Sequence, residues 1–326
     1  MKTRSLIPKV ECLVSDARIA WKVLNGVFAV YKPSAVSYLN MRNTIIHRLC
    51  EDLNSMHVRP PIQHVCIEGN TTEKMNIVTH PSYADHPLVV GPRYQPKDFK
   101  LVCANYLNTD SSGLMVCGIN DNTKWINKLK DSKPPVSYKI KGILGQATDN
   151  YFKTGKIVER STYKFIKRDA IDRICASMQA AHQRKMFEIC GLDMQSQAAY
   201  ELAIQGLMRP ADSHIPMVYT IKCVDFTSPE FTLEIVAINE NEMYLKTLVH
   251  DLGMQLHSVA TCTQILCFRY ALFNLDLALL PKHWELQNVL DNIEQCHDIF
   301  NRNRYLLKQK NPILTEQDNK LKFVSD

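Results

Sequence analysis

The hydrophobic pattern is clearest near the middle of the chain, where two apolar runs enclose a polar segment. The apolar runs cover residues 101–104 and 114–119, and the polar segment between them, 105–112, ends at Gly113. Short apolar runs bounded by polar residues and glycine are typical of buried strands joined by a loop. We therefore predict two strands and a loop that presents polar side chains to a cleft. An ordinary strand connection is the alternative interpretation.

The first apolar run, residues 26–31, predicts a short buried strand that leads into Lys32-Pro33. Proline stiffens the exit from the strand and leaves Lys32 near the predicted cleft, where it would meet a phosphate. A surface lysine after a strand is the simpler interpretation. Ser37 is a suitable cap for a helix over 38–53. The apolar face of this helix is expected to hold Leu39, Ile46, Leu49 and Leu53.

The remaining pattern alternates further strands and helices. Residues 54–100 are less regular and contain two short candidate strands, 65–67 and 75–78. The pattern then predicts helices over 122–130, with Trp125 and Leu129 inward, and over 169–182, 195–206 and 242–256. It predicts strands over 136–144, 185–190 and 258–269, and a hairpin of 217–226 and 231–238. A final amphipathic helix with a polar tail is predicted in 281–326.

Composition narrows the class of protein. With 326 residues and 45% hydrophobic content the chain can bury a large core. The formal charge of +6 is compatible with a polyanionic partner but does not demand one. Eleven cysteines without Cys-x-x-Cys pairs suggest a reducing compartment and no zinc site. No apolar run approaches membrane-spanning length, and no Walker-type or dinucleotide glycine motif is present.

The first 25 residues carry five basic residues against two acidic ones. Two interpretations stay open for this segment, a mitochondrial targeting sequence and a plain N-terminal extension. Targeting sequences are usually poor in acids and rich in serine, which favours the plain extension slightly.

The central loop resembles the active-site loop of TruB-type pseudouridine synthases, which reads Gly-x-Leu-Asp-x-x-Ala-Ser/Thr-Gly-x-Leu. The matching residues are Leu107, Ser112 and Gly113, with Met115 in place of the last Leu. Asn105 replaces the Gly, and Asn108 replaces the Asp that is catalytic in the family.

Further blocks of the family follow in the same order. They are Lys32-Pro33 after the first strand, then Tyr138, Leu144-Gly145, Thr148-Asp149 and Gly155, then Tyr200 to Ala203 with Gly206, then Tyr244-Leu245 with Asp251 to Gly253, and finally Arg269 with Phe273. Lys246 stands where the family has an arginine, and Val136 replaces a lysine. The resemblance covers residues 26–280 and is nearest to the mitochondrial branch found in animals, which lacks the RNA-binding PUA domain.

The resemblance implies an α+β fold with a mixed, mostly antiparallel sheet and flanking helices. It implies a synthase domain over 26–280, an extension before it, and only a helix and tail over 281–326. It also implies isomerisation of uridine in mitochondrial RNA, most simply mRNA, with no cofactor, no metal and no membrane span. The implied catalytic positions are Asn108, Tyr138 and Lys246, and the implied RNA contacts are Lys32, Asp149, Tyr200 and Arg269.

Two replacements affect the expected chemistry. Breaking and remaking the bond between base and ribose needs a carboxylate as nucleophile or base, and Asn108 carries an amide. A catalytically impaired protein that binds RNA without modifying it is therefore the alternative function, and a protein scaffold without RNA is a weaker one. Asp110 offers another possibility, because residues two apart in an extended loop face the same side.

Overall fold

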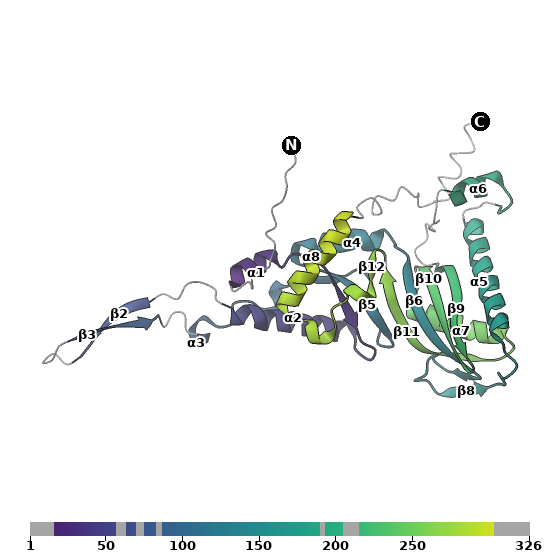
Figure 1. Ribbon diagram of the computed structural model, residues 1–326, viewed down its shortest axis with the longest axis horizontal. Coiled ribbons are helices and arrows are strands. Elements are labelled where there is room, and N and C mark those ends of the chain that lie inside the picture. Colours follow the sequence, from purple (N-terminus) through teal and green to yellow (C-terminus); the bar gives the residue numbers. More distant parts are fainter. Residues whose placement is uncertain are drawn as a thin grey trace.

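The computed structural model describes residues 16–56, 63–69, 75–82, 87–189, 193–204 and 215–302 (Figure 1). Its largest element is a sheet in the order β1-β5-β11-β6-β10-β9, with β4 paired to β5 and β12 paired to β11. The strand bounds are β1 Gly26–Lys32, β4 Leu101–Cys103, β5 Ser111–Ile119, β6 Val136–Leu144, β9 Met217–Thr227, β10 Glu230–Ile238, β11 Ala260–Tyr270 and β12 Phe273–Asn274.

One junction in this sheet is parallel. β5 and β11 run side by side with Ile265 opposite Ser111 and Cys267 opposite Gly113. All other neighbouring strands of the sheet are antiparallel. The expected mixed and mostly antiparallel sheet with flanking helices is confirmed.

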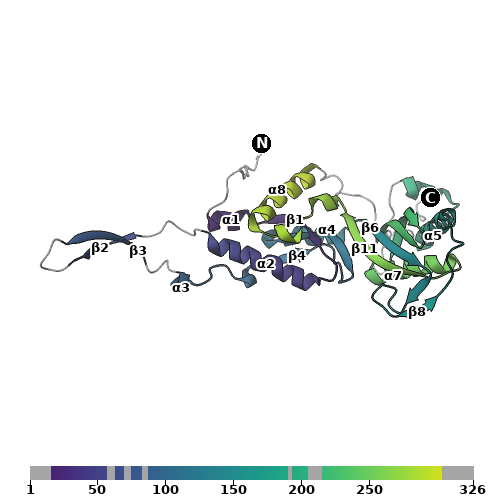
Figure 2. The same cartoon turned by 60° about the horizontal axis from the view of Figure 1, so that its bottom comes forward.

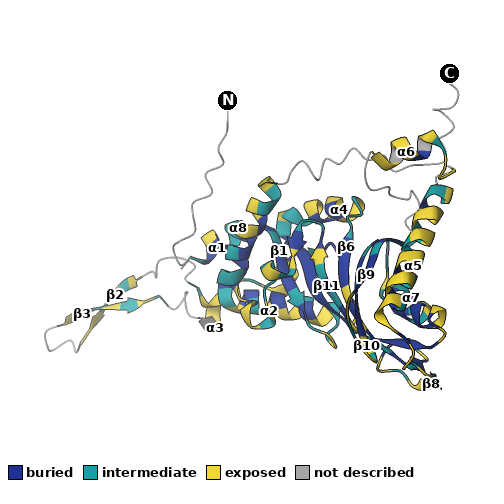
Figure 3. Ribbon diagram, turned by 45° about the vertical axis from the view of Figure 1, so that its right-hand side comes forward, coloured by how far each residue is buried: buried dark blue, intermediate teal, exposed yellow. Residues whose placement is uncertain are grey.

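Helices cover the sheet and close its core. The bounds are α1 Ala17–Val23, α2 Tyr38–Ser55, α3 Pro87–Val90, α4 Thr123–Asp131, α5 Arg168–Ile189, α6 Gln197–Ile204, α7 Glu242–Gln255 and α8 Leu286–Arg302. α5 packs on β9, α7 on β11, α4 on β5 and α8 on β1. The strands are mostly buried, while the outer helix faces are exposed (Figure 3). Both α1 and α8 contribute to the main core, and the domain limits at residues 26 and 281 stay a prediction.

Two small ribbons lie outside the main sheet. β2, Gln63–Glu68, pairs with β3, Asn76–Pro81, and this ribbon stands apart from the sheet in Figures 1 and 2. β7, Gln146–Thr148, pairs with β8, Ile157–Arg160. None of the described helices is long and apolar enough to cross a membrane.

Several local expectations differ from the structure. The predicted strand at 185–190 is wrong, because the described part of it, up to Ile189, continues α5, and residue 190 lies outside the described residues. Leu39 is 62% exposed and Trp125 is 48% exposed, so neither belongs to the buried face of its helix. The predicted Gly206 end of α6 lies outside the described residues.

Two cysteines are paired where the sequence suggested reduced thiols. Cys103 in β4 and Cys117 in β5 form a disulfide, and both are fully buried. The two residues are direct partners across the antiparallel β4–β5 pair, which brings their side chains together on one face of the sheet. This pair joins the strands that enter and leave the central loop.

Candidate active site

Lys246 lies at the centre of a buried charged group. Its Nζ atom is 2.6 Å from Oδ2 of Asp110 and 2.8 Å from Oε1 of Glu242. The exposed fractions of these side chains are 8% for Lys246, 28% for Asp110 and 10% for Glu242. We call Lys32, Asp110, Ser111, Glu242 and Lys246 the charged cluster.

Helix α7 places two members of the cluster together. Asn241 caps the helix by accepting a hydrogen bond from the backbone of Tyr244. Glu242 and Lys246 are four residues apart, which puts them on the same side of the helix. The neighbouring Leu245 and Val249 are buried and fix α7 to the sheet, so the charged residues are held against the central loop.

The first strand supplies Lys32, whose side chain is fully buried. Its Nζ donates to the carbonyl oxygens of Ser111 at 2.7 Å and of Pro33 at 3.1 Å. The backbone N–H of Ala35 donates to the carbonyl of Thr109. The backbone on both sides of Asp110 is thus tied to the exit of β1, and Lys32 holds the loop rather than lying at the surface.

Asn105 explains one departure from the family pattern. Its side-chain amide donates to the carbonyl of Leu114 and accepts from the backbone N–H of Val116. These two bonds attach the start of the loop to β5 and leave the amide group satisfied. An asparagine therefore fixes the loop at a position where the family has glycine.

The loop between β7 and β8 closes the other side of Lys246. The ammonium lies 4.7 Å from the centroid of the Phe152 ring, which is a cation–π contact. Thr148 donates to the carbonyl of Phe152, and Asp149 accepts from the backbone N–H of Lys156. A side chain at Gly155 would clash with Asp149 and Asn150. The Thr-Asp…Gly block thus shapes the turn that presents Phe152.

For both lysines, Lys32 and Lys246, burial lowers the pKa of the ammonium group and the neighbouring carboxylates raise it. Burial lowers the pKa of Lys32 to about 8, and the carboxylates of Glu242 and Asp110 offset part of this shift. Burial also favours a lower pKa for Lys246, but the hydrogen bonds that its ammonium donates to Asp110 and Glu242 outweigh burial and raise the pKa above its usual value. Of the two lysines, Lys246 therefore holds its proton, and its positive charge, to higher pH than Lys32 does.

Tyr138 and Gly113 lie in one row across the sheet with Lys32. Gly113 is opposite Lys32 on one side and Cys267 on the other, and Cys267 is opposite Tyr138. Strands are about 4.8 Å apart, so this row spans roughly 15 Å from β1 to β6. It aligns the loop end, the lysine and the tyrosine that the sequence singled out.

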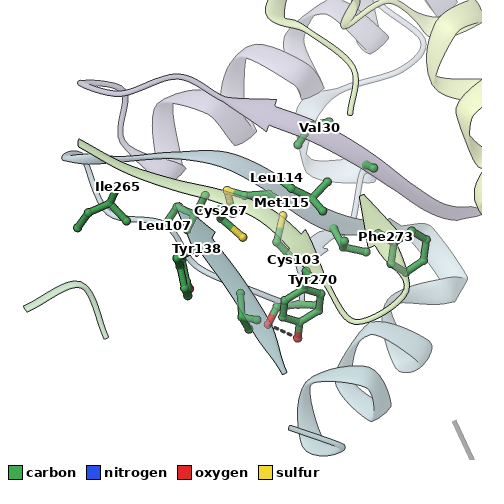
Figure 4. Packing of buried hydrophobic residues seen from close by; sticks show 14 of the residues in the cluster. Val30, Cys103, Leu107, Leu114, Met115, Tyr138, Ile265, Cys267, Tyr270 and Phe273 are labelled. Atoms are coloured by element: carbon green, nitrogen blue, oxygen red, sulfur yellow. Dashed lines mark hydrogen bonds between the residues drawn. The ribbon is translucent and has the colours of Figure 1, made fainter. Parts of the chain in front are cut away.

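The Tyr138 ring belongs to the same buried apolar cluster as Leu107 of the loop and Cys267 (Figure 4). The residue is only 5% exposed. Its hydroxyl donates to Oε1 of Glu240 at 2.7 Å. Burial raises the pKa of Tyr138 well above its ordinary value, and the nearby Glu240 adds to this. The phenol is neutral and oriented by one carboxylate.

Glu240 should make the stability of the protein depend on pH. Burial raises the pKa of this carboxyl from 4.5 to about 7, although the bond from Tyr138 opposes the shift. A raised carboxyl pKa gives stability that is present below pH 4.5 and is lost as the pH rises through 7. We expect Glu240→Gln, which keeps an acceptor for Tyr138, to remove this dependence and to stabilise the protein at pH 8 by on the order of 1–3 kcal/mol.

Urea unfolding at pH 5 and pH 8 measures this difference. Glu230→Gln, at an exposed position of β10, is the matched control and should leave the pH dependence unchanged. If stability depends on pH equally in the unmodified protein and in Glu240→Gln, then folding does not raise the pKa of Glu240 and its ionisation does not destabilise the protein.

The other expected site residues lie outside the charged cluster. Asn108 is exposed, and within the described residues no hydrogen bond joins it to the charged cluster. Asp149 is exposed and forms the turn described above. Tyr200 is 62% exposed on α6. Arg269 is exposed at the end of β11 and donates to the carbonyl of Ala271.

Three residues of the site were not expected from the sequence, namely Glu242, Ser111 and Phe152. Glu242 has a visible signal, since an acidic residue four positions before Lys246 on a predicted helix indicates a pair. Ser111 donates to Oε2 of Glu242 at 2.6 Å, and no pattern indicates this contact. Among the described residues no group of three or more His, Cys, Asp or Glu is arranged to hold a metal ion.

The arrangement offers one partly exposed carboxylate beside a fixed cation, with an aromatic ring against that cation. Asp110 supplies the carboxylate, Lys246 the cation and Phe152 the ring, while Tyr138 and Leu107 belong to the buried apolar core. Such a combination suits acid–base or nucleophilic chemistry on a flat, uncharged ring attached to a polar backbone.

Comparison with known proteins gives a consistent family. The family description "TruB family pseudouridylate synthase (N terminal domain)" matches residues 100–243. The mitochondrial pseudouridylate synthase TRUB2 of Xenopus tropicalis is 36% identical over 283 residues, which are 85% of this chain and 86% of that protein. The mitochondrial TRUB2 of Homo sapiens is 34% identical over 277 residues, 83% of each chain.

A solved structure is also similar. In the crystal structure of an archaeal box H/ACA sRNP Nop10–Cbf5 complex, one chain is 12% identical to this protein with a TM-score of 0.43. The match covers 89% of this chain and 60% of that one, so this protein spans less than two thirds of its length.

Proposed function

Because this chain belongs to the mitochondrial branch of the TruB family of pseudouridine synthases, which act on RNA, we propose that it isomerises uridine to pseudouridine in mitochondrial mRNA. The mitochondrial location expected from the resemblance is confirmed by the relatives.

One observation carries the proposal. A loop carboxylate, Asp110, is ion-paired to Lys246 at 2.6 Å in the loop that corresponds to the active-site loop of the family. Lys246 already has Glu242 as a buried partner at 2.8 Å, so compensation of the lysine charge does not by itself require a second carboxylate at this place. The pair therefore favours catalysis over simple RNA binding.

The target base needs a pocket with an apolar wall, because it must leave the RNA stack before it reacts. We assign this wall to Tyr138 and Leu107. Tyr138 is 5% exposed, so the base reaches its ring only when the loop around Leu107 moves aside. The Glu240 bond at 2.7 Å then keeps the phenol in place while the loop moves.

The RNA contacts expected from the resemblance divide into two groups. Arg269 and Tyr200 are exposed, and we assign them to phosphate contact and base stacking, respectively. Lys32 and Asp149 are bonded to backbone groups of the protein. We assign these two residues to positioning of the loops that receive the RNA.

A second function is favoured by one residue. Asn108 stands at the position of the catalytic carboxylate, and loss of a catalytic nucleophile in other enzymes costs on the order of 10⁴–10⁶ in rate. A protein that binds RNA without modifying it would follow if no other carboxylate takes part. Its RNA affinity should still fall with rising salt concentration, since phosphate contacts release counterions.

A pseudouridine map of mitochondrial RNA with and without the protein tests the proposal. We expect specific mRNA sites to lose pseudouridine when the protein is absent. The purified protein should also release tritium from RNA that contains 5-tritiated uridine, because isomerisation frees the hydrogen at C5. Sites that disappear only from tRNA would contradict the mRNA assignment. RNA binding without any tritium release would establish the second function.

A further inference from the structure

We propose that Asp110 is the catalytic carboxylate of this protein and that the role has moved two residues along the loop from the position of Asn108. This inference rests on the proposed isomerisation. It concerns which residue performs the chemistry.

The loop backbone holds Asp110 more firmly than Asn108. The carbonyls of Thr109 and Ser111, on either side of Asp110, accept hydrogen bonds from Ala35 and Lys32, respectively. Ser111 also begins β5. A residue fixed on both sides keeps its side chain in one direction, which a catalytic group needs. Asn108 lies before this anchored stretch and is exposed.

Lys246 selects between the two positions. Its ammonium is 2.6 Å from Oδ2 of Asp110, and no hydrogen bond joins it to Asn108 among the described residues. The Phe152 ring lies against the ammonium at 4.7 Å. The cation that corresponds to the family arginine therefore serves the carboxylate of Asp110.

Glu242 is the other carboxylate beside Lys246, and its two oxygens are already used. Oε1 contacts Lys246 at 2.8 Å, and Oε2 accepts from the Ser111 hydroxyl at 2.6 Å. Its side chain is 10% exposed, against 28% for Asp110. Within the described part of the chain, Oδ1 of Asp110 has no hydrogen-bond partner. Asp110 is thus the carboxylate with an available oxygen.

The chemical step balances without any further reactant. Oδ1 of Asp110 attacks C1′ of the target ribose, and the C1′–N1 bond breaks with its electron pair leaving on the uracil anion. The uracil turns, and its C5 attacks C1′ while the bond to Asp110 breaks and restores the carboxylate. The proton on C5 then passes to water, and N1 takes up a proton. No oxidant, reductant or metal enters this sequence.

Tritium release in single turnover by Asp110→Asn tests the assignment. The amide cannot act as the nucleophile, so we expect the rate to fall by about 10⁴-fold or more. Lys246 keeps Glu242 as its partner at 2.8 Å, so the melting temperature and RNA affinity should change little. Asp131→Asn, at an exposed position of α4, is the matched control and should release tritium at the normal rate.

A double variant, Asn108→Asp with Asp110→Asn, distinguishes a change in the position of the catalytic carboxylate from a non-specific loss of activity. It returns the carboxylate to the family position, and we expect it to recover at least about tenfold over Asp110→Asn alone. If Asp110→Asn does not fold, Asp110→Glu takes its place. That variant keeps the ion pair but shifts the reactive oxygen by about 1 Å, which should lower the rate by on the order of 100-fold.

The outcomes are distinguishable. Normal release by the unmodified protein that persists in Asp110→Asn, or in Asp110→Glu at full rate, would overturn the role of Asp110 and leave the proposed function intact. No release by the unmodified protein, with RNA still bound, would overturn both.

Discussion

Replacing Lys246 with methionine is expected to abolish tritium release and to lower the free energy of unfolding by about 3–5 kcal/mol. The substitution removes the cation shared by Asp110 and Glu242 and leaves two carboxylates facing each other in a largely buried place. Lys246→Arg should retain most of the stability, because a guanidinium can bind both carboxylates.

The pH dependence identifies the cause of this loss. If unpaired carboxylates destabilise Lys246→Met, the loss measured by urea unfolding should shrink as the pH falls towards about 4, where carboxyl groups become protonated. Lys139→Met, at an exposed position of β6, is the matched control and should be nearly neutral. A loss of equal size at pH 4 and pH 8 would point to packing instead of charge.

Replacing Gly113 with alanine is expected to prevent formation of the β5–β11 junction. Gly113 has a φ of 122°, and an added Cβ would lie 2.1 Å from the carbonyl oxygen of Cys267 and 2.7 Å from its nitrogen. Backbone atoms in a central strand cannot move away as a flexible side chain can. We expect a loss of at least about 3 kcal/mol, with strain and steric overlap acting together.

Gly91 provides a control for the effect of backbone conformation alone. Its φ is 65°, and nothing lies within 4 Å of an added Cβ. Gly91→Ala should therefore cost only about 1 kcal/mol, the usual penalty of a left-handed residue without a clash. Thermal unfolding of both variants measures the difference. Equal losses of stability in the two variants would mean that the β11 backbone can shift to make room for the added Cβ and that the parallel junction is not rigid.

Sequence patterns located most elements because local rules and tertiary packing agree there. Val136–Leu144 alternates clearly and forms β6 over the same residues. The Ser37 side chain caps α2 by accepting from the backbone of Asn40, as its position predicted. In these places one hydrogen bond or one alternating face determines the structure, and both are visible in the sequence.

The misassigned elements show where packing overrides local preference. Residues 185–189 form a short stretch rich in apolar residues, but they continue α5, because Met186 extends the buried positions Ile171 and Cys175 at helical spacing. In α2 the buried positions are Met41, Ile45, Ile46, Leu49, Cys50 and Leu53. Leu39 lies in the first turn of α2 and is 62% exposed.

The identity of the carboxylate beside Lys246 could not be read from spacing. The resemblance aligns Asn108 with the family aspartate, and both 108 and 110 were consistent with an extended loop. The choice depends on where β5 begins and on contacts from Lys32 and Ala35, which are more than 70 residues away along the chain. Such long-range bonds have no local signature.

The contact between α8 and β1 limits how early the first part of the chain can finish folding during synthesis. Asn292 accepts from the backbone N–H of Ala29 and donates to the carbonyl of Leu277, which joins the last described helix to the first strand. A chain emerging from the ribosome cannot make this contact until nearly all of it has been synthesised. The half that contains β1 and Lys32 therefore keeps the apolar surface that packs against α8 exposed until α8 has been synthesised. Chaperones would have their longest opportunity to act on this half during biogenesis.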